Sequence, residues 1–204
     1  MRFRGIVLTG LAATIVLFGT GAKEHKLVDR WKDPEFQTRQ FKKLLIIAIT
    51  DDVEARKVFE NRFVSHLRGK GIEGVTSYSI VADLTKVDEL KREEILAALE
   101  ERGVDGAISV RVVPLKNTSE EEWGIAWKEE VQGDGTLRQL IEATLPLSGG
   151  KSKRYGVEAA LWDDDGWDRI WGGRTDPYTR DEMKKGAADF VQFVMYALDL
   201  VDLL

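Results

Sequence analysis

The spacing of hydrophobic positions changes several times along this chain, and each pattern predicts a different element. Residues 44–49 are apolar without alternation, which is typical of a strand that is covered on both faces. Residues 75–81 and 106–113 predict two further strands. Between these strands, apolar residues at helical spacing predict helices over residues 50–69 and 88–102, and each helix ends at a glycine.

Strand, helix, strand, helix, strand with short connections predicts parallel neighbours joined by right-handed crossovers. Residues 115–153 interrupt this order because they are polar and rich in glycine, and they predict a long mobile insertion. Asp165-Gly166 lies between the apolar runs 155–162 and 167–174, which predicts an antiparallel hairpin. Residues 181–204 predict a long amphipathic helix. The expected fold class is α/β: a single two- or three-layer domain with a βαβαβ parallel core, the long excursion, the hairpin and a C-terminal helix.

The amino-terminal segment has a pattern of its own. Arg2 and Arg4 precede an apolar run, and small residues follow up to position 22, which is typical of a secretory signal peptide. An uncleaved anchor is the alternative, since residues 5–22 reach the lower limit of roughly 17 residues for a membrane-spanning helix. Residues 23–43 then predict a polar tether, and residues 44–204 the single domain. We therefore expect a periplasmic or otherwise exported protein, with inner-membrane contact only through an uncleaved residue 5–22 segment.

Charge and cysteine content exclude several classes of partner and chemistry. The 204 residues carry 30 Lys and Arg against 35 Asp and Glu, a net charge of −5. Such a surface argues against a nucleic-acid partner. The sequence contains no cysteine, which excludes disulfides, thiolate catalysis and cysteine metal sites.

The chain offers few candidates for catalysis or metal binding. Its two histidines, His25 and His66, are not at metal-ligand spacing, and no Gly-x-Ser-x-Gly turn presents a serine. No glycine-rich loop follows residues 44–49, so the nucleotide-binding pattern is absent too. We therefore predict no cofactor, no metal and no catalytic residues.

Two acidic clusters resemble functional sites, but the residues around them argue against a functional role. Asp163, Asp164 and Asp165 precede Gly166 as in a calcium loop, but Leu161 and Gly172 would then occupy ligand positions that need carboxylates. Turn chemistry explains the same residues without a metal.

The other acidic cluster surrounds two tryptophans. Residues 120–122 and 129–130 are glutamates that bracket Trp123 and Trp127, and paired carboxylates near aromatics can mark a glycosidase cleft. Nothing in the sequence sets two of them at a working separation, so a solvated charge run is the simpler interpretation.

The hairpin predicts an aromatic face. A two-residue loop at Asp165-Gly166 pairs Trp162 with Arg169 and Leu161 with Ile170, which makes Trp162 and Trp171 diagonal neighbours on one face. We expect this face to be covered either by residues 115–153 or by a partner, with ordinary core packing as the alternative. The candidate interaction surface comprises Trp123, Trp127, Trp162, Arg169 and Trp171.

Four motifs together carry a family resemblance over most of the chain. They are Trp31-Lys32-Asp33-Pro34, Phe41-Lys42-Lys43 before the first strand, Phe59-Glu60, and Leu161-Trp162-Asp163 facing Arg169-Ile170-Trp171. The sequence thereby resembles a family of small bacterial envelope lipoproteins of unknown function. The resemblance implies a single α/β domain tethered to a membrane, and it supplies no catalytic residues.

The sequence departs from that family at the lipidation site. Where the family has the cysteine that becomes the lipidated amino terminus, this chain has Ala22, which offers no thiol for acylation. The expected function is that of a non-enzymatic envelope domain that binds an envelope protein or polymer. The alternative is a hydrolase or small-ligand protein whose site residues 115–153 form over the sheet, where open α/β sheets bind ligands.

Overall fold

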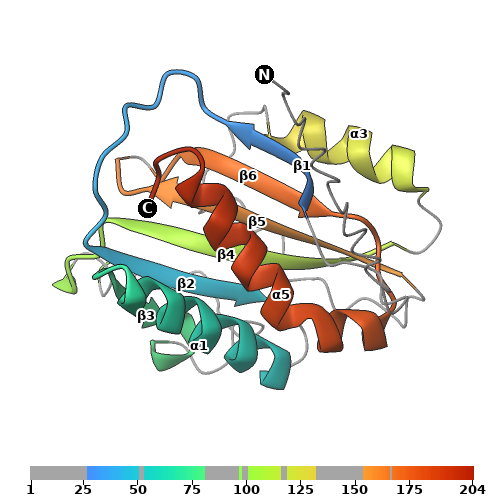
Figure 1. The fold of residues 1–204 in the computed structure, drawn as a ribbon, viewed down its shortest axis with the longest axis horizontal. Helices are drawn as coiled ribbons and strands as arrows, with labels where there is room; N and C mark the ends of the chain where they lie inside the picture. Colours follow the sequence, from blue (N-terminus) through green and yellow to red (C-terminus); the bar gives the residue numbers. More distant parts are fainter. Residues whose placement is uncertain are drawn as a thin grey trace, which may run out of the picture.

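A computed structural model describes residues 27–50, 53–80, 97, 101–115, 119–131, 154–165 and 167–204. The strands are β1 (Leu27–Lys32), β2 (Lys43–Ile49), β3 (Glu73–Thr76), β4 (Gly106–Pro114), β5 (Tyr155–Asp163) and β6 (Arg169–Thr175). The helices are α1 (Val53–Gly69), α3 (Glu120–Val131) and α5 (Arg180–Asp199), with a 3-10 turn η1 (Ser77–Ser79) after β3. Within the described residues the strands form one six-stranded sheet in the order β1-β6-β5-β4-β2-β3 (Figure 1).

The predicted α/β class is confirmed, but the strand expected over residues 75–81 lies at Glu73–Thr76 and is followed by the 3-10 turn η1. Strand β2 pairs in parallel with both β3 and β4, β5 and β6 form an antiparallel hairpin, and α5 is the C-terminal helix. The predicted signal segment and most of the predicted helix over residues 88–102 lie outside the described residues. None of the described helices is both long enough and apolar enough to cross a bilayer.

The expected tether contains a strand instead of being polar chain throughout. Strand β1 forms the edge of the sheet and pairs antiparallel with β6, with Trp31 opposite Gly172. Exposed Val28 and Arg30 alternate with half-buried Leu27 and Asp29, because one face of an edge strand is covered while the other meets water. The alternating segment is short and contains charged residues, so its sequence predicted a polar tether and not a strand.

One face of the sheet is covered by α1 and α5, which lie side by side in Figure 1. Phe59 of α1 meets Phe190 of α5 edge to face, with ring centroids 5.9 Å apart. Such aromatic pairs add a small specific gain to the burial of both rings. The main core lies between these helices and the sheet, and includes Leu44, Ile46, Phe63, Leu67, Ile108, Leu161, Val191, Val194 and Leu198.

The opposite face carries a second apolar cluster and the helix α3. Leu45, Ile47, Ala107 and Trp162 are buried together on this face. The residue 115–153 segment, predicted to be a mobile insertion, contains α3, a helix that packs on the sheet. Its remaining residues, 132–153 and 116–118, lie outside the described part of the chain.

Helix α3 begins at a capping box formed by Ser119 and Glu122. The backbone N–H of Glu122 donates to the Ser119 hydroxyl at 3.1 Å, and the Glu122 carboxylate accepts from the Ser119 backbone N–H at 2.7 Å. These reciprocal bonds satisfy amide donors that a helix start leaves unpaired. Hydrogen bonds to the Glu122 carboxyl from the backbone N–H and the side chain of Ser119 lower the pKa of this carboxyl below its ordinary value.

Two glycines shape the seat of α3 on the hairpin. An added side-chain carbon at Gly156 of β5 would lie 2.6 Å from the Trp123 ring, and one at Gly124 of α3 would lie 2.7 Å from the Arg174 guanidinium. Each glycine therefore leaves room for a large side chain of the other element. The Trp123 ring N–H donates to the Thr175 carbonyl at 3.3 Å, which fixes the indole in this seat.

Replacing Gly156 with alanine should displace Trp123 and loosen α3. We expect Gly156→Ala to lower the free energy of unfolding by about 1–3 kcal/mol, the usual cost of overpacking a well-filled interior. Gly69→Ala is the control, since an added carbon there meets nothing within 4 Å and alanine gains up to about 1 kcal/mol in a helix. Urea unfolding measures both changes, and equal stability of the two variants would contradict this seat.

Candidate functional site

The hairpin brings together one of the predicted pairs. Trp162 lies opposite Arg169, as predicted, and the Arg169 guanidinium stacks on its ring, 4.8 Å from the ring centroid. The Trp162 ring N–H donates to the Ser109 hydroxyl of β4 at 2.8 Å. The polar edge of this buried indole is therefore satisfied inside the sheet.

The predicted pairing of Leu161 with Ile170 is wrong. Leu161 lies opposite Trp171, because a register shift inserts Ile170 as an extra residue in β6. This bulge turns Trp171 toward the α1 and α5 side, where it joins the main core. Trp162 and Trp171 consequently belong to different faces, and the predicted diagonal pair does not form.

None of the four candidate indoles is available to a partner. Trp162 and Trp171 are 0% and 1% exposed, and Trp123 and Trp127 of α3 are 4% exposed each. Core packing, the alternative interpretation for the hairpin, accounts for Trp162 and Trp171. The interpretation of Trp123 and Trp127 as part of a solvated charge run is wrong, because both pack in a buried cluster with Leu115. The second face of the hairpin is covered, at its Gly156 end, by α3.

A row of charged side chains crosses the sheet beneath α3. Arg111 of β4, Glu158 of β5, Arg174 of β6 and Asp29 of β1 lie opposite one another in register. Arg111 donates from Nε to Glu158 Oε1 at 2.5 Å, and Arg174 pairs with Asp29. The side chains of Arg111, Glu158 and Arg174 are only 10–12% exposed.

The charged row neutralises itself. Positive and negative groups alternate across four strands, so each buried charge has an opposite neighbour, as buried ions require. The Arg174 guanidinium also lies 6.0 Å from the centroid of the Trp127 ring. Arg111 and Glu158 each interrupt an apolar run in β4 and β5, and this was the available signal, whereas β1 and β6 carry further charged residues. The four residues form a row only once the strand order is known.

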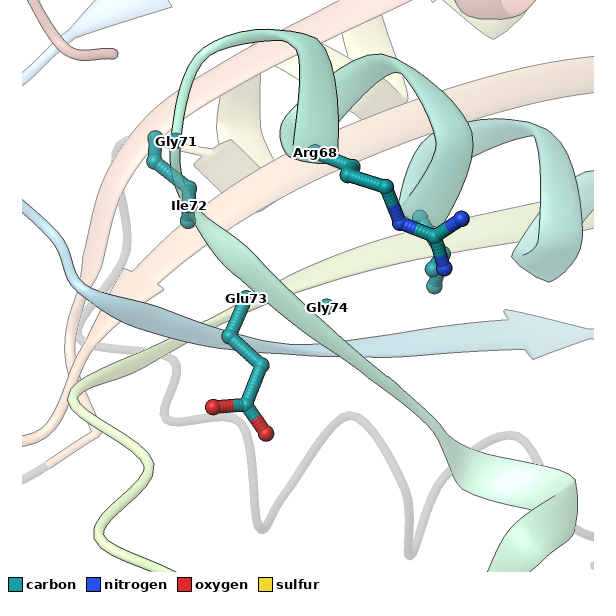
Figure 2. Close-up of a pocket in the computed structure, with 6 residues that line it drawn as sticks. Arg68, Gly71, Ile72, Glu73 and Gly74 are labelled. Carbon is teal, nitrogen blue, oxygen red and sulfur yellow. The ribbon is translucent and has the colours of Figure 1, made fainter.

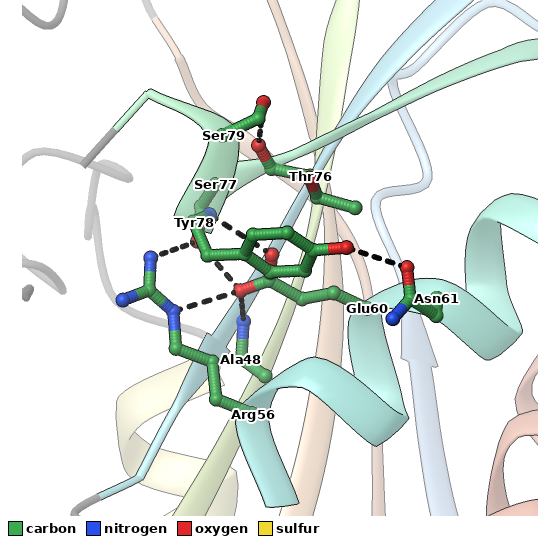
Figure 3. A network of polar contacts seen from close by, with 8 residues as sticks. All are labelled: Ala48, Arg56, Glu60, Asn61, Thr76, Ser77, Tyr78 and Ser79. Atoms are coloured by element: carbon green, nitrogen blue, oxygen red, sulfur yellow. Dashed lines mark hydrogen bonds and ion pairs between the residues drawn. The ribbon is translucent and has the colours of Figure 1, made fainter. Parts of the chain in front are cut away.

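A second buried polar cluster surrounds Glu60 of α1, near the carboxyl ends of β2 and β3 (Figure 3). Glu60 is 0% exposed. Its Oε1 accepts hydrogen bonds from the Ala48 N–H at 3.1 Å, from Arg56 Nε at 3.1 Å and from the Ser77 hydroxyl at 2.6 Å. Its Oε2 accepts from the Tyr78 N–H at 3.2 Å. One carboxylate therefore joins α1 to β2 and to η1.

This arrangement suits structure better than catalysis. Ser77 lies beside a carboxylate, as a nucleophile lies beside its base, but its hydroxyl also accepts from Arg56 at 2.7 Å and the residue is 5% exposed. Glu60 would have to abandon existing hydrogen bonds before it could take a proton. A reaction at Ser77 would therefore break the contacts that hold α1 in place.

The acidic hairpin turn holds no convincing metal site in the part of the chain that is described. No group of three His, Cys, Asp or Glu residues there is arranged to hold an ion. Burial raises the pKa of the Asp163 carboxyl, an effect that Arg39 opposes. Arg39 forms an ion pair with Asp164 and donates to the Asp105 carbonyl, so the turn is tied to the loop before β4.

A shallow pocket of about 330 Å³ lies between α1 and the edge strand β3 (Figure 2). Its lining includes Arg68 and Glu73, whose side chains extend in different directions. Glu73 pairs with Lys43 at 3.0 Å. In most small-ligand sites the polar groups converge on one point. Those of this pocket do not.

Comparison with known proteins gives weak structural likenesses. No family model matches the chain, and no curated protein matches it. The PelC dodecamer from Paraburkholderia phytofirmans is 14% identical with a TM-score of 0.42, over 83% of this chain and 94% of the PelC chain. A single-residue variant of that dodecamer is 12% identical with a TM-score of 0.41, over 81% of this chain and 93% of the other. Likeness at this level supports no inference about function.

Removing the Glu60 carboxylate should destabilise the fold strongly. We expect Glu60→Ala to cost about 3–5 kcal/mol, because it leaves the Arg56 charge buried without its partner. Glu54→Ala is the matched control on the same helix, since its exposed pair with Lys57 should be worth less than about 1 kcal/mol. Urea denaturation compares the two. A loss below about 1 kcal/mol for Glu60→Ala would contradict the structural role.

Proposed function

We propose that this chain is a non-enzymatic, exported domain of the bacterial cell envelope that binds another envelope protein. The observation that carries the proposal is an exposed apolar stripe on α5. The stripe consists of Phe193 and Tyr196 of α5 and of Leu200, the residue that caps its C-terminal end, and these are 36%, 59% and 55% exposed. The signal-peptide pattern of residues 1–22 supports the location.

The three side chains form one continuous ridge. Positions 193, 196 and 200 fall within about 60° of one another around a helix of 3.6 residues per turn. The opposite side of α5 is already buried against the sheet by Val191, Val194 and Leu198. The stripe is therefore not part of the apolar face by which α5 packs on the sheet.

Among the residues that the structure describes, the other exposed apolar side chains, which include Val28 of β1 at 38%, form no comparable ridge. Ile125 of α3 is 52% exposed, and Val53 and Val58 of α1 are 56% and 43% exposed. Scattered apolar residues of this kind are normal on a protein surface, whereas contiguous ones mark interaction sites.

The chemistry of the stripe favours a protein over a polysaccharide. Sugar hydroxyls need hydrogen-bonding partners, and the stripe offers one such group, the Tyr196 hydroxyl. Aromatic and aliphatic side chains, by contrast, are the usual centre of a protein interface. An envelope protein is therefore the partner that we propose in place of an envelope polymer.

The buried polar groups support a role without catalysis. Glu60 accepts four hydrogen bonds, and the charged row pairs each of its carboxylates with an arginine. Neither cluster leaves a group poised for proton transfer or nucleophilic attack.

Site-specific photo-crosslinking in the native envelope tests this function. A photo-crosslinking residue in place of Leu200 should give a discrete protein adduct, and Phe193→Ser with Tyr196→Ser should abolish the adduct. The double variant should change the free energy of unfolding by less than about 1 kcal/mol, because exposed side chains contribute little to stability.

The matched control places the same photo-crosslinking residue at Ile125, which is equally exposed but isolated on α3. No adduct is expected there. If the Leu200 position gives no protein adduct, or if the double variant keeps it, the proposed docking role is wrong.

A further inference from the structure

We infer that the α5 stripe docks a basic amphipathic segment, that is, an apolar ridge bordered by lysine or arginine. This inference depends on the proposed function and names the chemistry of its partner. The observation behind it is the charge distribution around the stripe, which is independent of the apolar surface itself.

Every charged residue of the last part of the chain is acidic. Residues 186–204 contain Asp189, Asp199 and Asp202 and no lysine or arginine. Asp189 is exposed one turn before Phe193, and Asp202 is exposed just beyond Leu200. The stripe is therefore bordered by carboxylates at both ends, which we call the acidic border (Asp189, Asp199 and Asp202).

The acidic border is unfavourable for an isolated helix. Carbonyl groups make the C-terminal end of a helix electronegative, so cations stabilise that end and anions do not. The last turn of α5 nevertheless has no basic residue. Compensation comes from elsewhere in the fold, since Lys70 pairs with Asp199 and Lys32 donates to the Val201 carbonyl at 2.9 Å.

The described part of the chain shows no ion pair at Asp189 or Asp202, and the nearest basic residues before Asp189 in the sequence are Lys184 and Lys185. The acidic border surrounds an apolar stripe that is not part of the core. Such a surface is complementary to a partner whose own apolar ridge is surrounded by positive charge.

The same border disfavours two other occupants. A second copy of this chain docked stripe to stripe would bring two sets of carboxylates together, and like charges across an interface are costly. An anionic bilayer surface would be repelled for the same reason.

The dimensions of the site specify the partner further. Leu200 stands seven positions after Phe193, about 10 Å along a helix. Because Asp199 is already paired with Lys70, the partner's basic residues should face Asp189 and Asp202, one at each end of its apolar ridge.

The test uses the full chain with the photo-crosslinking residue at Leu200, expressed in its native envelope. Charge reversal by Asp189→Lys with Asp202→Lys should lower the yield of the protein adduct roughly fivefold, since exposed ion pairs are each worth up to a few-fold in affinity. Glu54→Lys with Glu121→Lys is the control. It makes the same change in net charge on α1 and α3, and its adduct yield should stay within about twofold of the parent.

Sequencing of the crosslinked peptide completes the test. Basic residues that flank its apolar residues are the expected result. An acidic peptide, a lipid adduct, a second copy of this chain, or an adduct insensitive to the charge reversal would each overturn the inference.

These outcomes separate the inference from the proposed function. If the serine variants abolish the adduct and the lysine variants do not, the stripe still docks a protein and only the basic partner is wrong. If the parent chain gives no protein adduct, both proposals fail.

Discussion

The sheet has apolar side chains on both faces of its central strands, and both faces must be kept from water. Strands β2 and β5 are buried along nearly their whole length, which a single helical layer could not achieve. Helices α1 and α5 cover one face, and α3 covers part of the other through two tryptophans and a pair of glycines that make room for large side chains. The tryptophans are buried by this packing, so the surface that we propose for recognition among the described residues is the exposed apolar stripe of α5.

Buried charge follows from the same two-sided burial. Once polar residues enter strands that are covered on both faces, each must be paired, because an isolated buried charge is far costlier than a buried apolar group. The row from Asp29 to Arg111 meets this condition across four strands, and Glu60 meets it through four donors around α1. Residues that resemble catalytic groups by type thus take part in the contacts that hold the layers together.

Periodicity was sufficient to predict the strands over residues 44–49 and 106–113, the hairpin and the C-terminal helix, because these elements have long and regular apolar patterns. It placed the strand after α1 at residues 75–81, whereas that strand is Glu73–Thr76. It missed β1, whose short edge pattern is mixed with charges, and α3, whose start is marked by the Ser119 and Glu122 capping box in a run of glutamates. The predicted hairpin register was wrong at one residue, because no local signal in the sequence indicates the bulge at Ile170. This bulge determines which face of the sheet Trp171 joins. The apolar residues of the α5 stripe were also visible in the sequence. It could not be separated from the buried face of α5 until the sheet fixed which side of the helix points inward.

The central claim is that the α5 stripe is covered by a partner in the envelope while the buried indoles play no part in recognition. Oxidative footprinting of side chains, carried out in intact cells and on the purified protein, measures this directly. Phe193 and Tyr196 should react readily in the purified protein and several-fold more slowly in cells, whereas Trp123 and Trp162 should be unreactive in both. Equal reactivity of Tyr196 in the two settings would contradict the claim, and protection confined to Tyr78 would instead place binding at the carboxyl ends of the strands.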